Sequence, residues 1–299
     1  MPTKTGNGGH GQENYDPSTG QYVGKENKFL QEALNLSNQE IADEDLKNKY
    51  NLTNDDIENN RKIDQARFDN IKNAKSLKEQ KVYDSVVDSE GDELYNFFKS
   101  KEPQITQNIV SICENLGGKM YGLDQRIKSL SSIKDKINRN IKIYGMGIDD
   151  IKKDFGDGIR YTAIFNTAEF SDSVKRLLSE IQKNGYTIKK LKNRFLDHNG
   201  NPSTKYRDVI STLVSPEGIE FELQFNTVSG ICAKNGKEYK NGEFVDKEDG
   251  SKGSHFYYSE RRDIPKEEEE GLRARYLDYM MEKIWTGVPI PLNINKIND

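Results

Sequence analysis

Four polar side chains recur at every second position of one apolar segment. Segment 219–227 alternates apolar residues with Glu220, Glu222, Gln224 and Asn226, and a half-buried β-strand has this period of two. Two carboxylates and two amides would then face one side of a sheet. A carboxylate held on a strand can bind Mg²⁺ or act as a general base, although a solvated strand face has the same pattern.

A second group of residues is suited to phosphate. Arg126, Lys128, Ser132 and Lys136 lie close together in the sequence. If the segment is helical, Lys128, Ser132 and Lys136 are four residues apart and share one stripe. Because N–H groups at a helix N-terminus also attract anions, cations and a hydroxyl at this point would suit a polyphosphate. A solvated basic face would have the same composition.

An acidic turn precedes a predicted strand that begins near Asp157. Asp157 and Arg160 are three residues apart, so in a straight strand they would face opposite sides. Gly156 and Gly158 would permit a bulge that turns both toward one site. Asp154 shares the parity of Arg160 and is the reserve candidate for the carboxylate of that site.

Two further strands carry side chains that could bind a nucleotide. Tyr206 shares a strand face with Asp208, and an aromatic ring on a polar strand face can stack on a base. Lys190, Lys192 and Arg194 form a row on another strand face. The row suits phosphates of a ligand or of RNA, or it guards an edge strand against aggregation.

The composition restricts the class of protein. The chain has 299 residues, of which 33% are hydrophobic and 31% charged, so it has room for one large domain or two small ones. Its net charge of -4 argues against a protein that coats nucleic acid through bulk charge. Cys113 and Cys232 lack a metal-like spacing and are expected to be reduced thiols in a cytoplasmic protein. No membrane-spanning run or signal peptide is recognisable.

The elements that must position these residues are expected mainly after residue 84. Residues 1–25 are predicted to be a disordered tail, and residues 26–82 a charged helical leader with fragments at Lys28–Leu34 and Ile57–Ile71. Two helices should precede Gly117–Gly118, where glycines end the second.

The remaining elements alternate between helix and strand. They are predicted as a helix at 129–140, a strand at 156–165, a helix at 168–183, strands at 186–195, 206–214 and 219–227, a loop or flexible ribbon at 234–253, and a helix from Pro265 to about Lys283. The turn at 216–218 should join the last two strands as an antiparallel hairpin. This order predicts an α+β fold with a mixed, largely antiparallel central sheet flanked by helices.

In this order, the motifs resemble the RelA/SpoT-type nucleotide pyrophosphokinase (alarmone synthetase) domain over about residues 84–230. That domain has a nucleotidyltransferase-like synthetase fold. The family's Arg-x-Lys-x-x-x-Ser-Ile-x-x-Lys element is filled here by Arg126, Lys128, Ser132, Ile133 and Lys136.

Three later motifs extend the resemblance. The family's aspartate before a Gly-Ile-Arg strand corresponds to Asp157 or Asp154, and its arginine to Arg160. Its stacking tyrosine corresponds to Tyr206. Its Glu-Val-Gln-Ile-Arg-Thr motif is similar to Glu-Leu-Gln-Phe-Asn-Thr at 222–227.

The chain also departs from the family pattern. The family's Gly-Tyr-Gln-Ser-Leu-His reads Lys-Tyr-Arg-Asp-Val-Ile at 205–210, so the histidine is absent. The usual Lys-Asp-Tyr-Ile segment is not recognisable, and Lys190 or Lys192 would replace its lysine. This pattern resembles small toxic members of the family, some of them phage-linked, and the stretch His255–Arg262 is similar to one found in that branch.

The resemblance implies transfer of the β,γ-pyrophosphate of ATP to the 3′-hydroxyl of a purine nucleotide, with a (p)ppGpp- or (p)ppApp-type product. The catalytic residues would be Glu222, Asp157 and Gln224. ATP would be bound by Arg126, Lys128, Ser132, Lys136 and Arg160. The acceptor would be bound by Tyr206, Lys190, Lys192 and Arg194. Mg²⁺ would be held by Asp157 and Glu222, with Asp154 in reserve.

The resemblance leaves three functions open. The first is a small-nucleotide pyrophosphokinase that acts as a growth-inhibiting toxin, because His10, His198 and His255 cannot supply the hydrolase site of long family members. An antitoxin is then a possible partner. The second is pyrophosphorylation of the tRNA 3′ end. The third is a phage structural or interaction protein with a decayed nucleotide site. Residues 231–299 are expected to be a loop and helix that pack on the domain.

Overall fold

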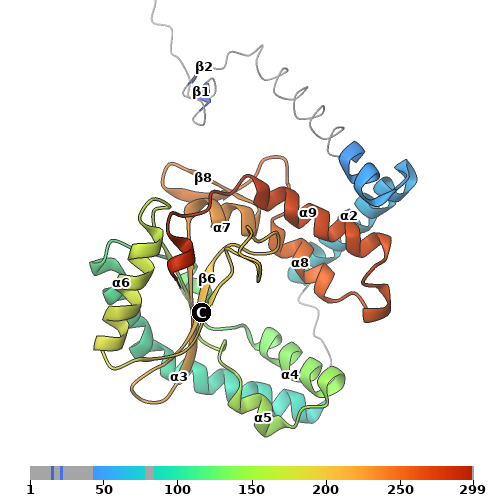
Figure 1. Ribbon diagram of the computed structural model, residues 1–299. Coiled ribbons are helices and arrows are strands. Elements are labelled where there is room, and N and C mark those ends of the chain that lie inside the picture. Colours follow the sequence, from blue (N-terminus) through green and yellow to red (C-terminus); the bar gives the residue numbers. More distant parts are fainter. Residues whose placement is uncertain (1–14, 17–20, 23–42, 78–83, 298–299) are drawn as a thin grey trace, which may run out of the picture. The chain divides into compact units, whose positions relative to one another are not determined.

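A computed structural model describes Tyr15–Asp16, Gln21–Tyr22 and residues 43–77 and 84–297 (Figure 1). The chain divides into two units, Met1–Ile71 and Lys72–Asp299.

The first unit is helical where it is described, apart from one short strand pair. Strands β1 (Tyr15–Asp16) and β2 (Gln21–Tyr22) pair in antiparallel fashion. Residues 43–50 are helical, and α2 (Asn54–Leu77) includes the predicted fragment Ile57–Ile71. The rest of the predicted tail and the fragment Lys28–Leu34 lie outside the described residues.

The second unit is built on a five-stranded sheet of order β3-β4-β7-β6-β5. Its strands are β3 (Lys119–Tyr121), β4 (Arg160–Ile164), β5 (Thr187–Asn193), β6 (Val209–Val214) and β7 (Glu220–Asn226). Strands β4 and β7 are parallel, and the other three neighbouring pairs are antiparallel. The predicted α+β fold with a mixed, largely antiparallel sheet is therefore confirmed, and so is the β6–β7 hairpin.

Strand β7 lies at the centre of the sheet, and its strictly alternating sequence gives it one apolar face and one polar face. Phe221, Leu223 and Phe225 are each 0% exposed, and they belong to one apolar core with side chains of α3 (Ser85–Asn115) and α6 (Phe170–Lys183). Figure 1 shows these two helices on one side of the sheet. The polar residues of β7 face the other side.

Helix α3 differs from the prediction of two helices. Asp84 caps it, since its side chain accepts a hydrogen bond from the Val87 backbone N–H at 2.9 Å. The helix continues through Pro103. Pro103 is exposed, so the Lys99 carbonyl that loses its helical partner can face water. Gly117–Gly118 follows the end of the helix, as predicted.

Several elements after β7 were not anticipated by the sequence pattern. Helices α7 (Val228–Asn235) and α8 (Ser254–Arg262) cover the face of the sheet opposite α3 and α6. Helix α9 (Leu272–Thr286) comes after α8 in the chain. The predicted helix from Pro265 is wrong in its first part. Pro265 precedes only a 3-10 turn, and α9 begins after Gly271, because glycine is a poor residue for a helix interior.

The expected ribbon after α7 is a hairpin of β8 (Lys237–Lys240) and β9 (Glu243–Asp246). Gly236 and Gly253 close its base. A Cβ on Gly253 would lie 2.2 Å from the backbone nitrogen of Gly236, and Gly236 has φ +66, a conformation that glycine adopts without strain. The end of α7 and the start of α8 are therefore held together by backbone contact.

The remaining helices are α4 (Leu130–Tyr144) and α5 (Ile148–Lys153), and 3-10 turns occur at Leu123–Gln125 and Ile294–Lys296. Both cysteines are free, as expected. Within the described ranges, no helix has the length and apolar character needed to cross a membrane.

The alternation of β7 predicts unequal effects of two substitutions. Leu223→Ala should lower the free energy of unfolding of the protein by about 2–5 kcal/mol, because it leaves a cavity in the core. Glu220→Ala, on the opposite face of the same strand, removes a surface ion pair with Lys189 and should cost at most about 1 kcal/mol. Urea unfolding followed by circular dichroism measures both, and equal losses would contradict the assigned faces.

Candidate active site

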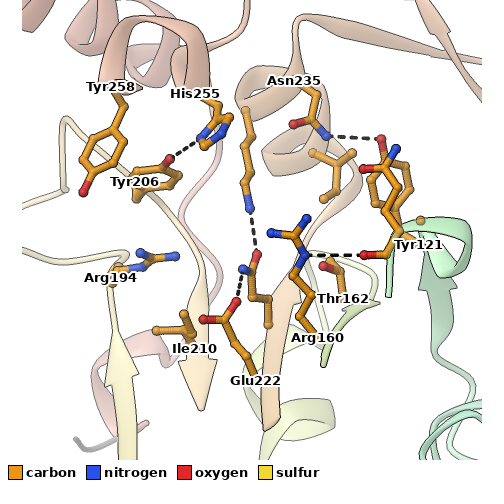
Figure 2. Close-up of a pocket in the computed structure, with 15 residues that line it drawn as sticks. Tyr121, Arg160, Thr162, Arg194, Tyr206, Ile210, Glu222, Asn235, His255 and Tyr258 are labelled. Atoms are coloured by element: carbon orange, nitrogen blue, oxygen red, sulfur yellow. Dashed lines mark hydrogen bonds between the residues drawn. The ribbon is translucent and has the colours of Figure 1, made fainter. Parts of the chain in front are cut away.

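The polar face of the sheet forms the floor of a cavity of about 300 Å³. Figure 2 shows Arg160 and Thr162 of β4, Ile210 of β6 and Glu222 of β7 in this floor. Helices α7 and α8 supply the opposite wall, together with Tyr121 at the end of β3. The cavity therefore lies on the side of the sheet away from the core helices.

Three side chains form a continuous row of hydrogen bonds across the cavity. Lys234 on α7 donates to the side-chain oxygen of Gln224 at 2.7 Å. The side-chain nitrogen of Gln224 donates to Glu222 Oε1 at 2.5 Å. Gln224 and Glu222 are two residues apart on β7, so the strand itself places them side by side.

Glu222 has the properties of a general base. Burial raises the pKa of the Glu222 carboxyl above its ordinary value, and the negative charge of Asp157 also raises it. The hydrogen bond from Gln224 lowers the pKa but offsets only part of this rise. A carboxylate with a raised pKa accepts a proton more readily. The backbone register places Arg160 of β4 directly beside Glu222.

Asp157 is held between the two lysines that the sequence had grouped with phosphate. Its Oδ2 lies 2.7 Å from Lys128 Nζ, and its Oδ1 lies 2.5 Å from Lys136 Nζ. Burial alone would raise the pKa of this carboxyl, but the charges and hydrogen bonds of the two lysines lower it to about 2. Asp157 is therefore ionised at neutral pH.

The segment that carries Lys128 runs antiparallel beside the start of β4. The Lys128 backbone N–H donates to the Gly158 carbonyl at 2.9 Å, and the Arg160 N–H donates to the Arg126 carbonyl at 2.8 Å. The predicted stripe of one helix is wrong for Lys128, because Ser129 caps α4 and Lys128 precedes the cap. Lys128 and Lys136 meet at Asp157 through this pairing instead.

Three other predicted site residues have different partners. Arg126 forms an ion pair with the buried Glu102 of α3. The side chain of Ser132 accepts a hydrogen bond from Ser129 at 2.8 Å, within the cap of α4. Asp154 is exposed at the end of α5, and Asp157 is the carboxylate whose charge acts on Glu222.

Tyr206 does not present an open ring to a ligand. It is 7% exposed, the Arg194 guanidinium lies 4.6 Å from its ring centroid, and its hydroxyl is 2.7 Å from His255 Nδ1. Asp208 holds Arg194 with two hydrogen bonds of 2.6 Å each. The predicted stacking of a base directly on Tyr206 is therefore blocked on the ring face that Arg194 covers.

His255 completes this side of the cavity. The residue as a whole is exposed, but its imidazole lines the cavity, where partial desolvation and the charges of Lys234 and Arg262 lower the pKa of His255 to about 4. The ring is neutral at physiological pH. The uncharged imidazole can therefore form its hydrogen bond with the Tyr206 hydroxyl without placing a positive charge in the cavity.

The basic row on β5 lies beside the cavity. Lys190 and Lys192 pair with Thr212 and Ile210 of β6, so they share the sheet face of Glu222, but both are exposed at the edge strand. Lys192 lines a second cavity, of about 670 Å³, which shares Arg194 with the first.

The donor set is compatible with Mg²⁺. Asp157 and Glu222 interact electrostatically, and Mg²⁺ in nucleotide sites is usually held by one or two carboxylates and substrate phosphates. Within the described part of the chain, no group of three or more His, Cys, Asp and Glu side chains is placed to bind a metal.

Sequence analysis did not identify Lys234 or Asp208 as site residues. Lys234 is on a helix that the sequence signals poorly, since Gly230 interrupts it and Thr227 is the main sign of its start, as its N-cap. For Asp208, the bidentate partner is Arg194, which directly follows β5, and such a long-range contact is not visible in a local sequence pattern.

No family model and no curated protein matches this chain. Several solved structures are similar to it, among them the following three. The complex between the Type VI effector Tas1 and its immunity protein has 20% identity and a TM-score of 0.44, and the match covers 66% of this chain and 96% of that one. The small alarmone synthetase 1 from Bacillus subtilis bound to its product pppGpp has 11% identity and a TM-score of 0.31, with 63% and 89% covered. The protein smu.1046c from Streptococcus mutans UA159 has 10% identity and a TM-score of 0.32, with 65% and 92% covered.

The Asp157 cluster predicts a pH-dependent loss of stability. Because the folded-state pKa is about 2, the ionised form stabilises the fold by about 2 kcal/mol above pH 4. This contribution is lost as the pH falls from about 4 through about 2. Asp157→Asn should therefore destabilise the protein at pH 7, with a difference from the parent that shrinks toward pH 2. Urea unfolding at a series of pH values measures this, and a difference independent of pH would contradict it.

Proposed function

We propose that this protein is an ATP-dependent pyrophosphokinase that transfers the β,γ-pyrophosphate of ATP to the 3′-hydroxyl of a purine nucleotide. The observation that carries the proposal is Glu222, a half-buried carboxylate of raised pKa in the floor of a cavity that Arg160, Arg194 and Lys234 also line. The transferred group is highly charged, so its transfer depends on alignment and charge neutralisation more than on covalent catalysis.

Lys128, Lys136 and Arg160 are the residues best placed to bind the phosphates of ATP. The two lysines converge on Asp157, and Arg160 is next to Glu222 in the register of the sheet. Arg126 supports them indirectly, because its backbone pairs with β4 while its guanidinium binds Glu102.

Glu222 takes the proton of the acceptor hydroxyl. The hydroxyl oxygen then forms a bond to the β-phosphorus of ATP, and the bond between that phosphorus and the α–β bridging oxygen breaks. The electron pair stays with that oxygen, and AMP leaves. Gln224 holds Glu222 through the 2.5 Å hydrogen bond and so fixes the direction of the base.

Mg²⁺ is the cofactor of this proposal, held by Asp157 and Glu222. When bound, the ion neutralises charge on the transferred phosphates. Asp157 is ionised at neutral pH, which is the protonation state that a metal ligand needs.

The acceptor base is bound at Arg194 in this proposal. The guanidinium lies over the Tyr206 ring and is fixed by Asp208, yet 32% of its side chain remains exposed. A planar cation of this kind can stack on a base, whereas the covered face of Tyr206 cannot.

A tRNA acceptor is the second candidate. The observation that favours it is the larger cavity beside the first, lined by Lys192, Lys205 and Arg194, because a strand of RNA would need such a basic path next to its 3′ end. A protein with a decayed site is the third candidate, and the hydrogen-bonded row of Lys234, Gln224 and Glu222 argues against it.

Glu222→Gln should reduce pyrophosphate transfer by about 10²–10⁴-fold, because the amide cannot accept the proton. The measurement is incubation with Mg²⁺ and ATP labelled in the γ-phosphate, with GDP, GTP, ADP, ATP or tRNA as acceptor. Label on a nucleotide supports the first function, label on tRNA the second, and label on neither the third. AMP formation by the variant at the parent rate would rule out Glu222 as the base.

The product of an unregulated synthetase would accumulate, so we propose that the protein inhibits growth and that an antitoxin protein is its partner. Induced expression in bacteria should arrest growth. The double variant Asp157→Ala with Glu222→Ala should relieve the arrest at equal protein level, because it removes both proposed metal ligands and the base. Normal growth with the parent protein at confirmed expression would contradict the toxin role.

A further inference from the structure

Lys234 has no part in the transfer as proposed above, yet it is one end of the row that leads to Glu222. It lies in the last turn of α7, 2.7 Å from the Gln224 side-chain oxygen and 5.8 Å from the centre of the Tyr206 ring. It lies outside the sheet, on the helix that begins directly after the strand that carries Glu222.

The donor and acceptor properties of the row allow one arrangement. A lysine ammonium can only donate hydrogen bonds, and an ionised carboxylate can only accept them. The amide of Gln224, which can do both, must therefore turn its oxygen to Lys234 and its nitrogen to Glu222. Among the described residues, the amide of Gln224 is the hydrogen-bond partner of Glu222, which leaves the second carboxylate oxygen for a substrate hydroxyl.

The surroundings of the row are strongly charged. Burial, with the charges of Arg194 and Arg160, lowers the pKa of Lys234 below its ordinary value, and the carboxylates of Asp208 and Glu222 offset only part of this. The charged or titratable groups that face Glu222 and Lys234 from the surrounding elements are Asp157, Arg160, Arg194, Asp208 and His255.

We propose that Lys234 is a positioning residue of the transfer reaction: it fixes the amide of Gln224 in the orientation that holds Glu222 toward the acceptor hydroxyl. The proposal rests on the role of Glu222 as the base. It assigns the helix that follows β7 to the catalytic apparatus, in addition to the strands that carry the sequence motifs.

The backbone around α7 supports this role. Gly236 ends the helix two residues after Lys234, and Gly253 packs on it so closely that an added Cβ would lie 2.3 Å from the Lys234 carbonyl oxygen. The main chain at Lys234 is therefore confined by close contact with the backbone of Gly253. A rigid support of this kind is what a positioning residue needs.

The test uses Lys234→Met, with Lys237→Met as the matched control. Lys237 is three residues along the chain and pairs with Asp246 at 2.7 Å on the β8–β9 hairpin, so its loss should leave transfer unchanged. Lys234→Met should lower kcat about 10- to 100-fold with a smaller change in KM. Lys234→Arg, which is also donor-only, should recover part of the loss.

A double-mutant cycle separates positioning from direct contact with substrate. If Lys234 acts through Gln224, then Lys234→Met combined with Gln224→Met should be no slower than Gln224→Met alone. Losses that multiply would show that Lys234 acts on the substrate itself and would overturn the proposal, as would an unchanged kcat in Lys234→Met.

A comparison with the parent protein separates the two proposals. If the parent protein transfers pyrophosphate and Lys234→Met keeps the parent kcat, the positioning role is contradicted while the proposed function stands. If the parent protein transfers no pyrophosphate to any acceptor, the proposed function fails, and the positioning role fails with it.

Discussion

The site depends on the register of one central strand. β7 is hydrogen-bonded to β4 on one edge and β6 on the other, so its side chains cannot change faces without a shift of both pairings. A shift of one residue would bring Glu222 into the apolar core and expose Phe221 or Leu223. Burial of three apolar side chains of β7 stabilises this register. The same register keeps the Glu222 carboxylate in the cavity.

The charges of the site are largely paired within the protein. Asp157 is bound by two lysines, Asp208 holds Arg194, and Gln224 links Lys234 to Glu222. These pairs keep long side chains in place before a ligand arrives, which reduces the ordering that binding requires. In the proposed reaction, an incoming phosphate would therefore compete with Asp157 for Lys128 and Lys136. A divalent cation bound to Asp157 would favour the exchange.

The sequence predicted the fold class and the strand carrying Glu222 because both depend on local periodicity. The alternation in β7 is strict, and turns at 216–218 and 184–185 leave little choice of boundaries. Helix α7 escaped prediction since it is short and contains Gly230. The role of Lys234 escaped for a different reason: its contact with Gln224 joins a helix to a strand, and no spacing rule connects two such positions.

The same limit applies to Tyr206 and Arg194. Each was recognised as a residue that could bind an acceptor, but their mutual stacking and the link to Asp208 are tertiary contacts. Lys128 shows the reverse case, because the expected helical stripe is absent and yet Lys128 and Lys136 meet at one carboxylate. Residue types can thus predict which side chains lie together even where the geometry that assembles them differs from the expected one.

The backbone contact between Gly236 and Gly253 has a consequence for how this fold can diversify. The two glycines join the ends of the β8–β9 hairpin at its base, so the intervening residues form an outgrowth whose entry and exit points coincide. The turn at its tip, where Asn241 has φ 54 and Gly242 has φ 89, can change in length while the flanking helices keep their positions. New surface, and with it new binding partners, can be acquired at this tip without rebuilding the floor of the cavity.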